Sequence, residues 1–215
     1  TVHVHVLYMY STCTCTVHVH VQYMYMYSTC ACAVHVHVQH PAPAECLGER
    51  EQARRVVLRV RVRPVVDAIH GATYIQKSTL FPQEIGLAAS WDTSLAREMG
   101  RITAYETRAS GVPWNFSPVL DLGRKPIWSR FFETLGEDVY LAKTLGSKIV
   151  DGYQGGTSID KNHVAACLKH YVGYGFPRTG RDRTPALIPE RTMLEHHLPP
   201  FKESIKNGAL TVMVN

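Results

Sequence analysis

The amino-acid sequence predicts an α/β protein with a parallel sheet, because strand and helix patterns alternate from residue 65 onward. Four apolar stretches of strand length are separated by three stretches of helical periodicity, at about 45 residues per unit. Connections of this length suit parallel strands joined by right-handed crossovers, as in a doubly wound sheet or a (β/α)8 barrel. No G-x-G-x-x-G follows the first strand, which disfavours a dinucleotide-binding sheet.

Polar side chains at the ends of these strands favour the barrel. The first strand, in VVDAIHG, ends at Asp67, and the second, in VPWNFSPVLDLG, ends near Asp121. The third strand, VAACL, delivers Lys169 and His170 to a glycine-rich loop, and the fourth, in ALTVMVN, ends at Asn215. Side chains gathered from several strand ends onto one site are typical of the C-terminal face of a barrel. A barrel needs eight strands, and the sequence pattern identifies four. We therefore expect an incomplete (β/α)8 barrel.

Three helices are expected between the strands, and glycines follow all three. Trp91, Asp92 and Thr93 offer an N-cap for the first helix, and the second helix is expected to begin at about Asp138. The third helix is expected to bend at Pro199 and Pro200. The apolar residues at helical spacing that we expect in the core are Leu95, Met99 and Ile102, then Leu141, Leu145 and Ile149, then Leu194, Leu198, Phe201 and Ile205.

Residues 1–40 form a low-complexity repeat tract built from Val-His, Tyr-Met and Thr-Cys alternations. One DNA repeat, GTACAT, encodes all three alternations in its three reading frames. We therefore expect the tract to be disordered or to associate with itself through alternating strands. The alternative is a set of strands in which His-x-His and Cys-x-Cys hold zinc.

The linker and the overall composition exclude several classes of protein. Residues 41–64 begin as a Pro/Ala linker and become Arg-rich, with six Arg against three Glu between residues 45 and 63. This run supplies +3 of the formal net charge of +5, so the charge does not indicate a nucleic-acid-binding surface. No stretch of about 18 apolar residues is present to span a membrane, and no signal-peptide pattern indicates a compartment. No cofactor motif or metal site is predicted in residues 65–215.

The side chains expected at the strand ends suit a ligand that is rich in hydroxyl groups. Asp67 can accept hydrogen bonds from two vicinal hydroxyls, and Lys169 and His170 can donate to others. Trp114 and Trp128 could stack on a sugar face, but rings of this size are more often buried, and we expect them in the core.

These residues lie in motifs that resemble the N-terminal barrel domain of glycoside hydrolase family 3, in particular its β-glucosidases. The motifs are DAIHG, TLFPQEIGLAASWD, AYETRASGVPWNFSPVLDLGR, ETLGED, KHYVGYGFPRTGRDRTPA and LPPFKESIKNGALTVMVN, within residues 65–215. The resemblance implies a retaining enzyme that hydrolyses terminal, non-reducing β-D-glucosyl residues of a β-glucoside or oligosaccharide.

The resemblance also implies which residues bind the sugar. Asp67 would bind hydroxyls in the first subsite, together with Arg130, Lys169 and His170, and Met213 would lie beside it. Members of the family commonly have RDPRWGR where this chain has RKPIWSR, a departure next to the arginine.

No catalytic residue is predicted in this chain. Related glucosidases take a nucleophilic Asp from a strand after VMVN and an acid/base Glu from a following domain, so we expect the chain alone to be inactive. Two alternatives remain open: a residual carbohydrate-binding fragment, and a gene-model fragment with no function of its own.

Overall fold

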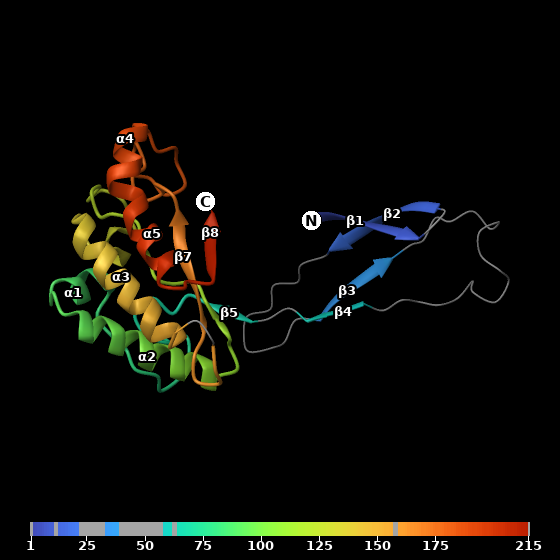
Figure 1. Cartoon of the computed structure of the whole chain (residues 1–215), viewed down its shortest axis with the longest axis horizontal. Coiled ribbons are helices and arrows are strands. Elements are labelled where there is room, and N and C mark those ends of the chain that lie inside the picture. The colour runs from blue at the N-terminus through green and yellow to red at the C-terminus, as the bar shows by residue number, and fades with distance from the viewer. Residues whose placement is uncertain are drawn as a thin grey trace. The chain divides into compact units, whose positions relative to one another are not determined.

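The structure, a computed structural model, consists of two compact units, Thr1–Arg63 and Pro64–Asn215 (Figure 1). It describes residues 2–10, 13–21, 33–38, 58–61, 64–156 and 159–214.

The first unit contains an antiparallel sheet in the strand order β1-β2-β3-β4. Its strands are β1 (Val2–Tyr10), β2 (Cys13–Val21), β3 (Ala33–Val38) and β4 (Leu58–Arg61). The register places Val opposite Val and His opposite His, as in Val4↔Val19 and His5↔His18. The described parts of the repeat tract pair with one another as strands, as in the expected association through alternating strands. The rest of the tract and most of the linker lie outside the described residues. So do the His and Cys side chains on which the zinc alternative depends.

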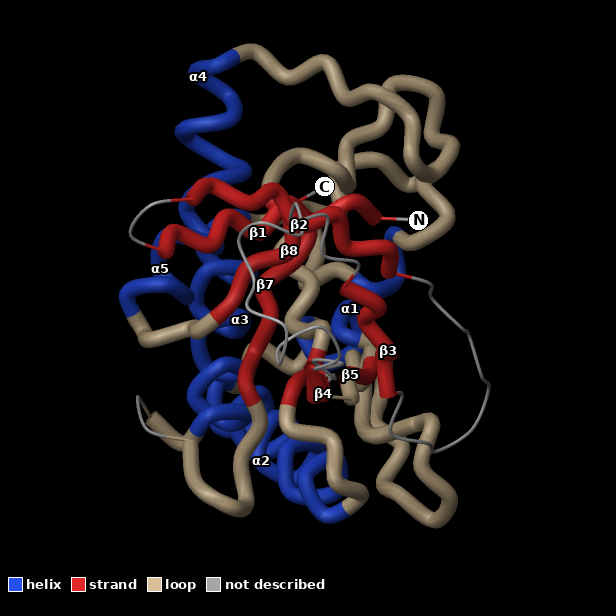
Figure 2. Tube along the Cα trace, turned by 90° about the vertical axis from the view of Figure 1, so that its right-hand side faces the viewer, coloured by secondary structure: helices blue, strands red, loops and turns tan. Residues whose placement is uncertain are grey.

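The second unit is built on a parallel sheet in the strand order β5-β6-β7-β8, which confirms the α/β class. The strands are β5 (Val65–Val66), β6 (Trp114–Asn115), β7 (Ala165–Tyr171) and β8 (Thr211–Val214). Each connection between neighbours carries helix, as expected for parallel strands. Figure 2 shows β7 and β8 running side by side, and Figure 1 shows α2, α3 and α5 on one side of the sheet.

The strands differ from the sequence prediction at two places. The second strand is only two residues long, although the carbonyls of Ser117 and Pro118 still accept from the N–H groups of Cys167 and Lys169 in β7. The chain rejoins β7 through a single parallel bridge between Val119 and Lys169. The third strand is longer than predicted, so that Lys169 and His170 belong to β7 and do not follow it. Asn215 lies outside the described residues.

The two long helices begin where the sequence predicts, and each has an aspartate as its N-cap. In α2 (Thr93–Ala109), the Asp92 carboxylate accepts from the backbone N–H of Ser94 at 2.7 Å. In α3 (Val139–Gln154), the Asp138 carboxylate accepts from the N–H of Leu141 at 2.7 Å. Two short helices, α1 (Glu84–Ala88) and the 3-10 turn η2 (Phe131–Glu133), were not predicted. Among the described residues, no helix has the length and apolar content needed to cross a membrane.

The third helical region is irregular where the two prolines approach. It consists of α4 (Glu190–Thr192), a π-helical turn η3 (Met193–His197) and α5 (Leu198–Lys206). Pro199 and Pro200 have no N–H to donate to the carbonyls of the preceding turn. The π-helical hydrogen bonds of η3 therefore lie in the turn before the two prolines. The prolines themselves lie in the first turn of α5, where missing donors cost least.

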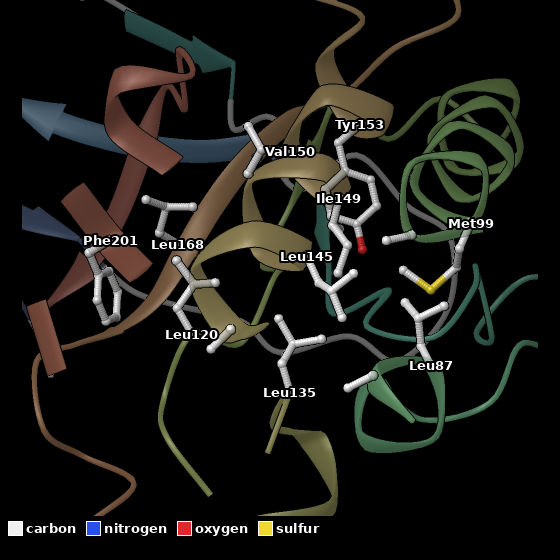
Figure 3. Close-up of a cluster of buried hydrophobic side chains, with 14 of the residues drawn as sticks. Leu87, Met99, Leu120, Leu135, Leu145, Ile149, Val150, Tyr153, Leu168 and Phe201 are labelled. Atoms are coloured by element: carbon white, nitrogen blue, oxygen red, sulfur yellow. The ribbon is translucent and has the colours of Figure 1, made fainter. Parts of the chain in front are cut away.

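The core lies between the sheet and the helices. Figure 3 shows part of it, including Leu145 and Ile149 of α3 with Tyr153 beside them. The buried apolar residues of this cluster are Leu87, Ala88, Ala96, Met99, Ala104, Leu120, Leu122, Leu135, Ala142, Leu145, Ile149, Val150, Tyr153, Val164, Ala166, Leu168 and Phe201.

Three residues predicted for the core are exposed instead: Leu95, Leu194 and Ile205. Leu95 is 51% exposed because the buried face of α2 consists mainly of small residues, such as Ala96 and Gly100. That face has to be small because α3 lies very close to it. A Cβ added to Gly100 would come within 2.6 Å of the carbonyl oxygen of Ile149.

Replacing Gly152 of α3 by alanine is expected to destabilise the second unit by about 1–3 kcal/mol. The added Cβ would overlap the carbonyl oxygen of Arg97 in α2, which cannot move without moving the helix. Urea unfolding followed by circular dichroism measures the loss. The exposed Tyr105 of α2 is the control, since its replacement by alanine should change the free energy of unfolding by less than about 0.5 kcal/mol. Equal effects of the two changes would contradict the close helix contact.

Candidate functional site

A pocket of about 1160 Å³ lies where β5, β7 and β8 end. This volume is slightly above the ~300–1,000 Å³ of ordinary small-molecule sites. All five residues that the sequence analysis assigned to sugar binding line it: Asp67, Arg130, Lys169, His170 and Met213. The other lining residues are Ile69, Tyr74, Phe116, Glu133, Val172, Gly173, Tyr174, Arg183, Thr184, Pro185 and Ala186.

Lys169 and Asp67 form an ion pair at one wall of the pocket. Lys169 Nζ donates to Asp67 Oδ1. The lysine side chain is 2% exposed, whereas the Asp67 side chain is 46% exposed. A buried ammonium group needs such a partner, because an unpaired charge away from water is very costly. The pair thus presents a half-exposed carboxylate and an adjacent cation to whatever fills the pocket.

Asp67 is held in place through its neighbour Ala68. The side chain of Asn115 in β6 accepts from the N–H of Ala68 at 2.8 Å and donates to its carbonyl oxygen at 3.0 Å. The Tyr153 hydroxyl donates to the same carbonyl at 3.1 Å. The backbone pairing of β5 ends before Ala68, and these side-chain hydrogen bonds hold the chain in place beyond that point.

His170 is oriented by Asp121, which is buried behind it. The Asp121 carboxylate accepts from the ring Nδ1 of His170 at 2.7 Å and from its backbone N–H at 3.0 Å. It accepts a third bond from the N–H of Gly175 at 2.9 Å. An ionised carboxylate only accepts, so Nδ1 carries the ring proton and Nε2 is left for a ligand. A Cβ at Gly175 would lie 2.7 Å from the Cβ of Asp121, so this approach requires glycine.

Arg130 is fixed by a two-pronged ion pair with Glu133 of η2. Its Nε donates to Glu133 Oε1 at 2.8 Å, and Nη2 donates to Oε2 at 2.7 Å. The hydrogen bond to Glu133 raises the pKa of the guanidinium further above its ordinary value. The changed residues in RKPIWSR therefore leave this arginine at the pocket, beside the ring of Tyr174.

Trp128 and Asp182 support the pocket from behind. Trp128 Nε1 donates to Asp182 Oδ1 at 3.0 Å, and the ring is buried, as predicted. Burial acts to raise the pKa of Asp182, but hydrogen bonds from Tyr174 and Trp128 outweigh it and lower the pKa. Trp114 donates to Thr211 Oγ1 at 2.9 Å. Neither tryptophan lines the pocket, whose aromatic residues are Tyr74, Phe116 and Tyr174.

Several contributing residues were missed by sequence reasoning. Asp121 was predicted at a strand end without its role towards His170. Glu133 and Asp182 were not predicted at all. The only signal for Glu133 is its place three residues after Arg130, a spacing that suits an ion pair within one helical turn.

The pocket lies at the C-terminal ends of parallel strands and is lined by paired carboxylates and cations, a lining whose chemistry suits a polar ligand. The profile described as "Glycosyl hydrolase family 3 N terminal domain" matches residues 40–215. The chain therefore belongs to glycosyl hydrolase family 3.

Relatives and solved structures agree with this membership. The chain is 45% identical, over 70% of its own length, to a lysosomal beta glucosidase of Dictyostelium discoideum, and 35% identical, over 67%, to a beta-xylosidase of Formosa agariphila. A crystal structure of a beta-glucosidase from Listeria innocua in complex with glucose is similar, with a TM-score of 0.68 and 35% identity over 74% of this chain. The chain spans about a fifth of the relatives' length, covering 19% of the first relative, 21% of the second and 22% of the solved chain.

Proposed function

We propose that this chain forms the sugar-binding part of a glycoside hydrolase that removes terminal, non-reducing β-D-glucosyl residues. The observation that carries the proposal is the Lys169–Asp67 pair, a charged donor and a charged acceptor at the pocket wall. Relatives named as beta-glucosidases and a solved beta-glucosidase in complex with glucose support the choice of sugar. Within this proposal, residues 65–215 are the hydrolase domain, preceded by the repeat tract 1–40 and the linker 41–64.

The pocket residues divide the recognition of a glucosyl ring between them. Asp67 accepts from two neighbouring hydroxyls, and Lys169 donates to one of the same oxygens. His170 offers Nε2, and Arg130 donates the N–H groups that Glu133 leaves free. Met213 supplies an apolar contact at the end of β8.

No carboxyl group described at the site is assigned a catalytic role. Retaining hydrolysis needs a nucleophile and an acid/base about 5–5.5 Å apart, both free to reach the glycosidic bond. Asp67 is paired with Lys169, and Glu133 is paired with Arg130. Asp121 is buried and already accepts three hydrogen bonds. The reaction uses carboxyl groups alone, so the proposal involves no cofactor or metal.

The direct test is calorimetric binding of p-nitrophenyl 1-thio-β-D-glucoside, a neutral compound that resists hydrolysis. The chain is expected to bind it, and D67N is expected to weaken binding tenfold to hundredfold, roughly the value of a hydrogen bond to a charged group. D92N is the matched control, because Asn replaces Asp well at an exposed helix N-cap.

The same preparation is then given the hydrolysable O-glucoside. We expect no release of p-nitrophenol, because the two carboxyl groups that line the pocket, those of Asp67 and Glu133, are engaged in ion pairs. Release at an enzymatic rate would contradict this assignment of roles, and absence of thioglucoside binding would contradict the proposed function.

A further inference from the structure

Glu84, the first residue of α1, is a fully buried acid close behind the pocket. Its Oε1 accepts from the backbone N–H of Val119 at 3.3 Å and from Ser117 Oγ at 3.4 Å. Its Oε2 is also buried and has no partner among the described residues. Glu84 does not line the pocket, and no part of the proposed sugar recognition uses it.

The Val119 N–H needs this acceptor because of how the segment lies in the sheet. Lys169 of β7 bonds to both sides of Val119, donating to the carbonyl of Pro118 at 3.2 Å and accepting from the N–H of Leu120 at 2.7 Å. In a parallel bridge of this kind, the N–H of Val119 itself points away from β7. A longer β5 would offer a carbonyl oxygen to the N–H of Val119. Because β5 ends at Val66, the carboxyl of Glu84 accepts this hydrogen bond instead.

The surroundings of Glu84 favour the protonated form of its carboxyl. Burial raises its pKa well above the ordinary value, and the nearby Glu133 carboxylate raises it further. The N–H of Val119, the ammonium of Lys169 and the hydroxyl of Ser117 act in the opposite direction and do not reverse the shift. Tyr153 of α3 also faces this acid. Burial first, and then Glu84, raises the pKa of the Tyr153 hydroxyl.

We propose that Glu84 is a positioning residue for Lys169: its buried carboxyl holds the N–H of Val119, and so anchors the segment that pairs with Lys169, whose ammonium stays with Asp67. An ionised Glu84 would compete with Asp67 for the same cation and repel Glu133, which holds Arg130. Two of the groups assigned to sugar binding would then shift together. The effect on sugar binding rests on the proposed function, whereas the effect on Lys169 does not.

The sign of the pH dependence follows from the raised pKa. In the unfolded chain Glu84 ionises near 4.5, so above that pH folding has to take up a proton. Stability contributed by the protonated acid is present in full below the unfolded pKa and declines as pH rises. The decline ends at the folded pKa, above which Glu84 is ionised in both states.

The test compares the wild-type chain with E84Q and with E190Q, a matched change at an exposed glutamate at the start of α4. Glutamine keeps an acceptor for Val119 and cannot ionise, so E84Q is expected to fold. In ligand-free wild type and E190Q, the 15N shift of Lys169 Nζ should titrate as pH rises above 4.5, the ordinary pKa of the acid, and Glu84 ionises. In E84Q this titration should be absent, and the urea midpoint should fall less with rising pH.

Thioglucoside affinity is the second readout. Over the same rise in pH it should fall about fivefold in the wild type, the size of a charge interaction of roughly 1 kcal/mol, and stay within about twofold in E84Q. A Lys169 titration that is unchanged in E84Q overturns the inference. A wild-type chain that binds no thioglucoside contradicts the proposed function, and the ligand-free titration then decides the role of Glu84 by itself.

Discussion

Replacing Lys169 by methionine is expected to reduce thioglucoside binding by about 100-fold, the upper end for a hydrogen bond to a charged group. The change keeps most of the side-chain volume and removes the ammonium that pairs with Asp67. Asp67 is 46% exposed, so water can solvate its carboxylate and the fold should survive. Isothermal titration calorimetry measures the affinity, and circular dichroism checks that K169M is folded.

The control for this change is K202M, at an exposed lysine of α5 that does not line the pocket. Its affinity for the thioglucoside should equal that of the wild type. A folded K169M that binds within about twofold of the wild type would falsify the role of the ion pair in sugar recognition.

Changing Asp121 to asparagine is expected to lower the free energy of unfolding by about 2–4 kcal/mol and to weaken thioglucoside binding. The carboxylate accepts from three N–H groups, two of His170 and one of Gly175. An asparagine NH2 would face at least one of these donors, and the site is too buried for water to intervene. Urea unfolding measures the stability, and calorimetry measures the binding.

The control for the Asp121 change is D138N, at the exposed N-cap of α3, where asparagine is about as good as aspartate. D138N should lower the free energy of unfolding by less than about 0.5 kcal/mol. Similar losses in D121N and D138N would show that Asp121 does not hold His170 through the bonds described.

Local signals in the sequence predicted the helices well. Asp92 was among the residues offered as a cap, because the interaction of an N-cap spans only two or three residues, and the second helix was expected from about Asp138. Helical spacing alone did not predict which side of α2 is buried. It favoured Leu95, but the tight contact with α3 selects the glycine and alanine face, and that contact is a property of two helices.

Strand ends predicted Asp67, Lys169 and His170 as binding residues, whereas Arg130 and Met213 were added by resemblance to a family. Nothing local in the sequence connects Asp67 with Lys169, which lie 102 positions apart. The role of Asp121 towards His170, and the buried acid Glu84, were missed for the same reason. An acidic residue in a motif gives no sign that its partners are backbone N–H groups from other segments.

The bonds around Asp67 and Ala68 have a consequence for how the pocket forms. Asn115 and Tyr153 reach Ala68 across 47 and 85 positions of sequence, and Lys169 reaches Asp67 across 102. Contacts of such long range form only after most of a domain has folded, since each must overcome a large loss of chain entropy. The pocket should therefore appear together with global folding. Sugar binding should accordingly protect the amides of α3 and β7 from hydrogen exchange as one cooperative unit.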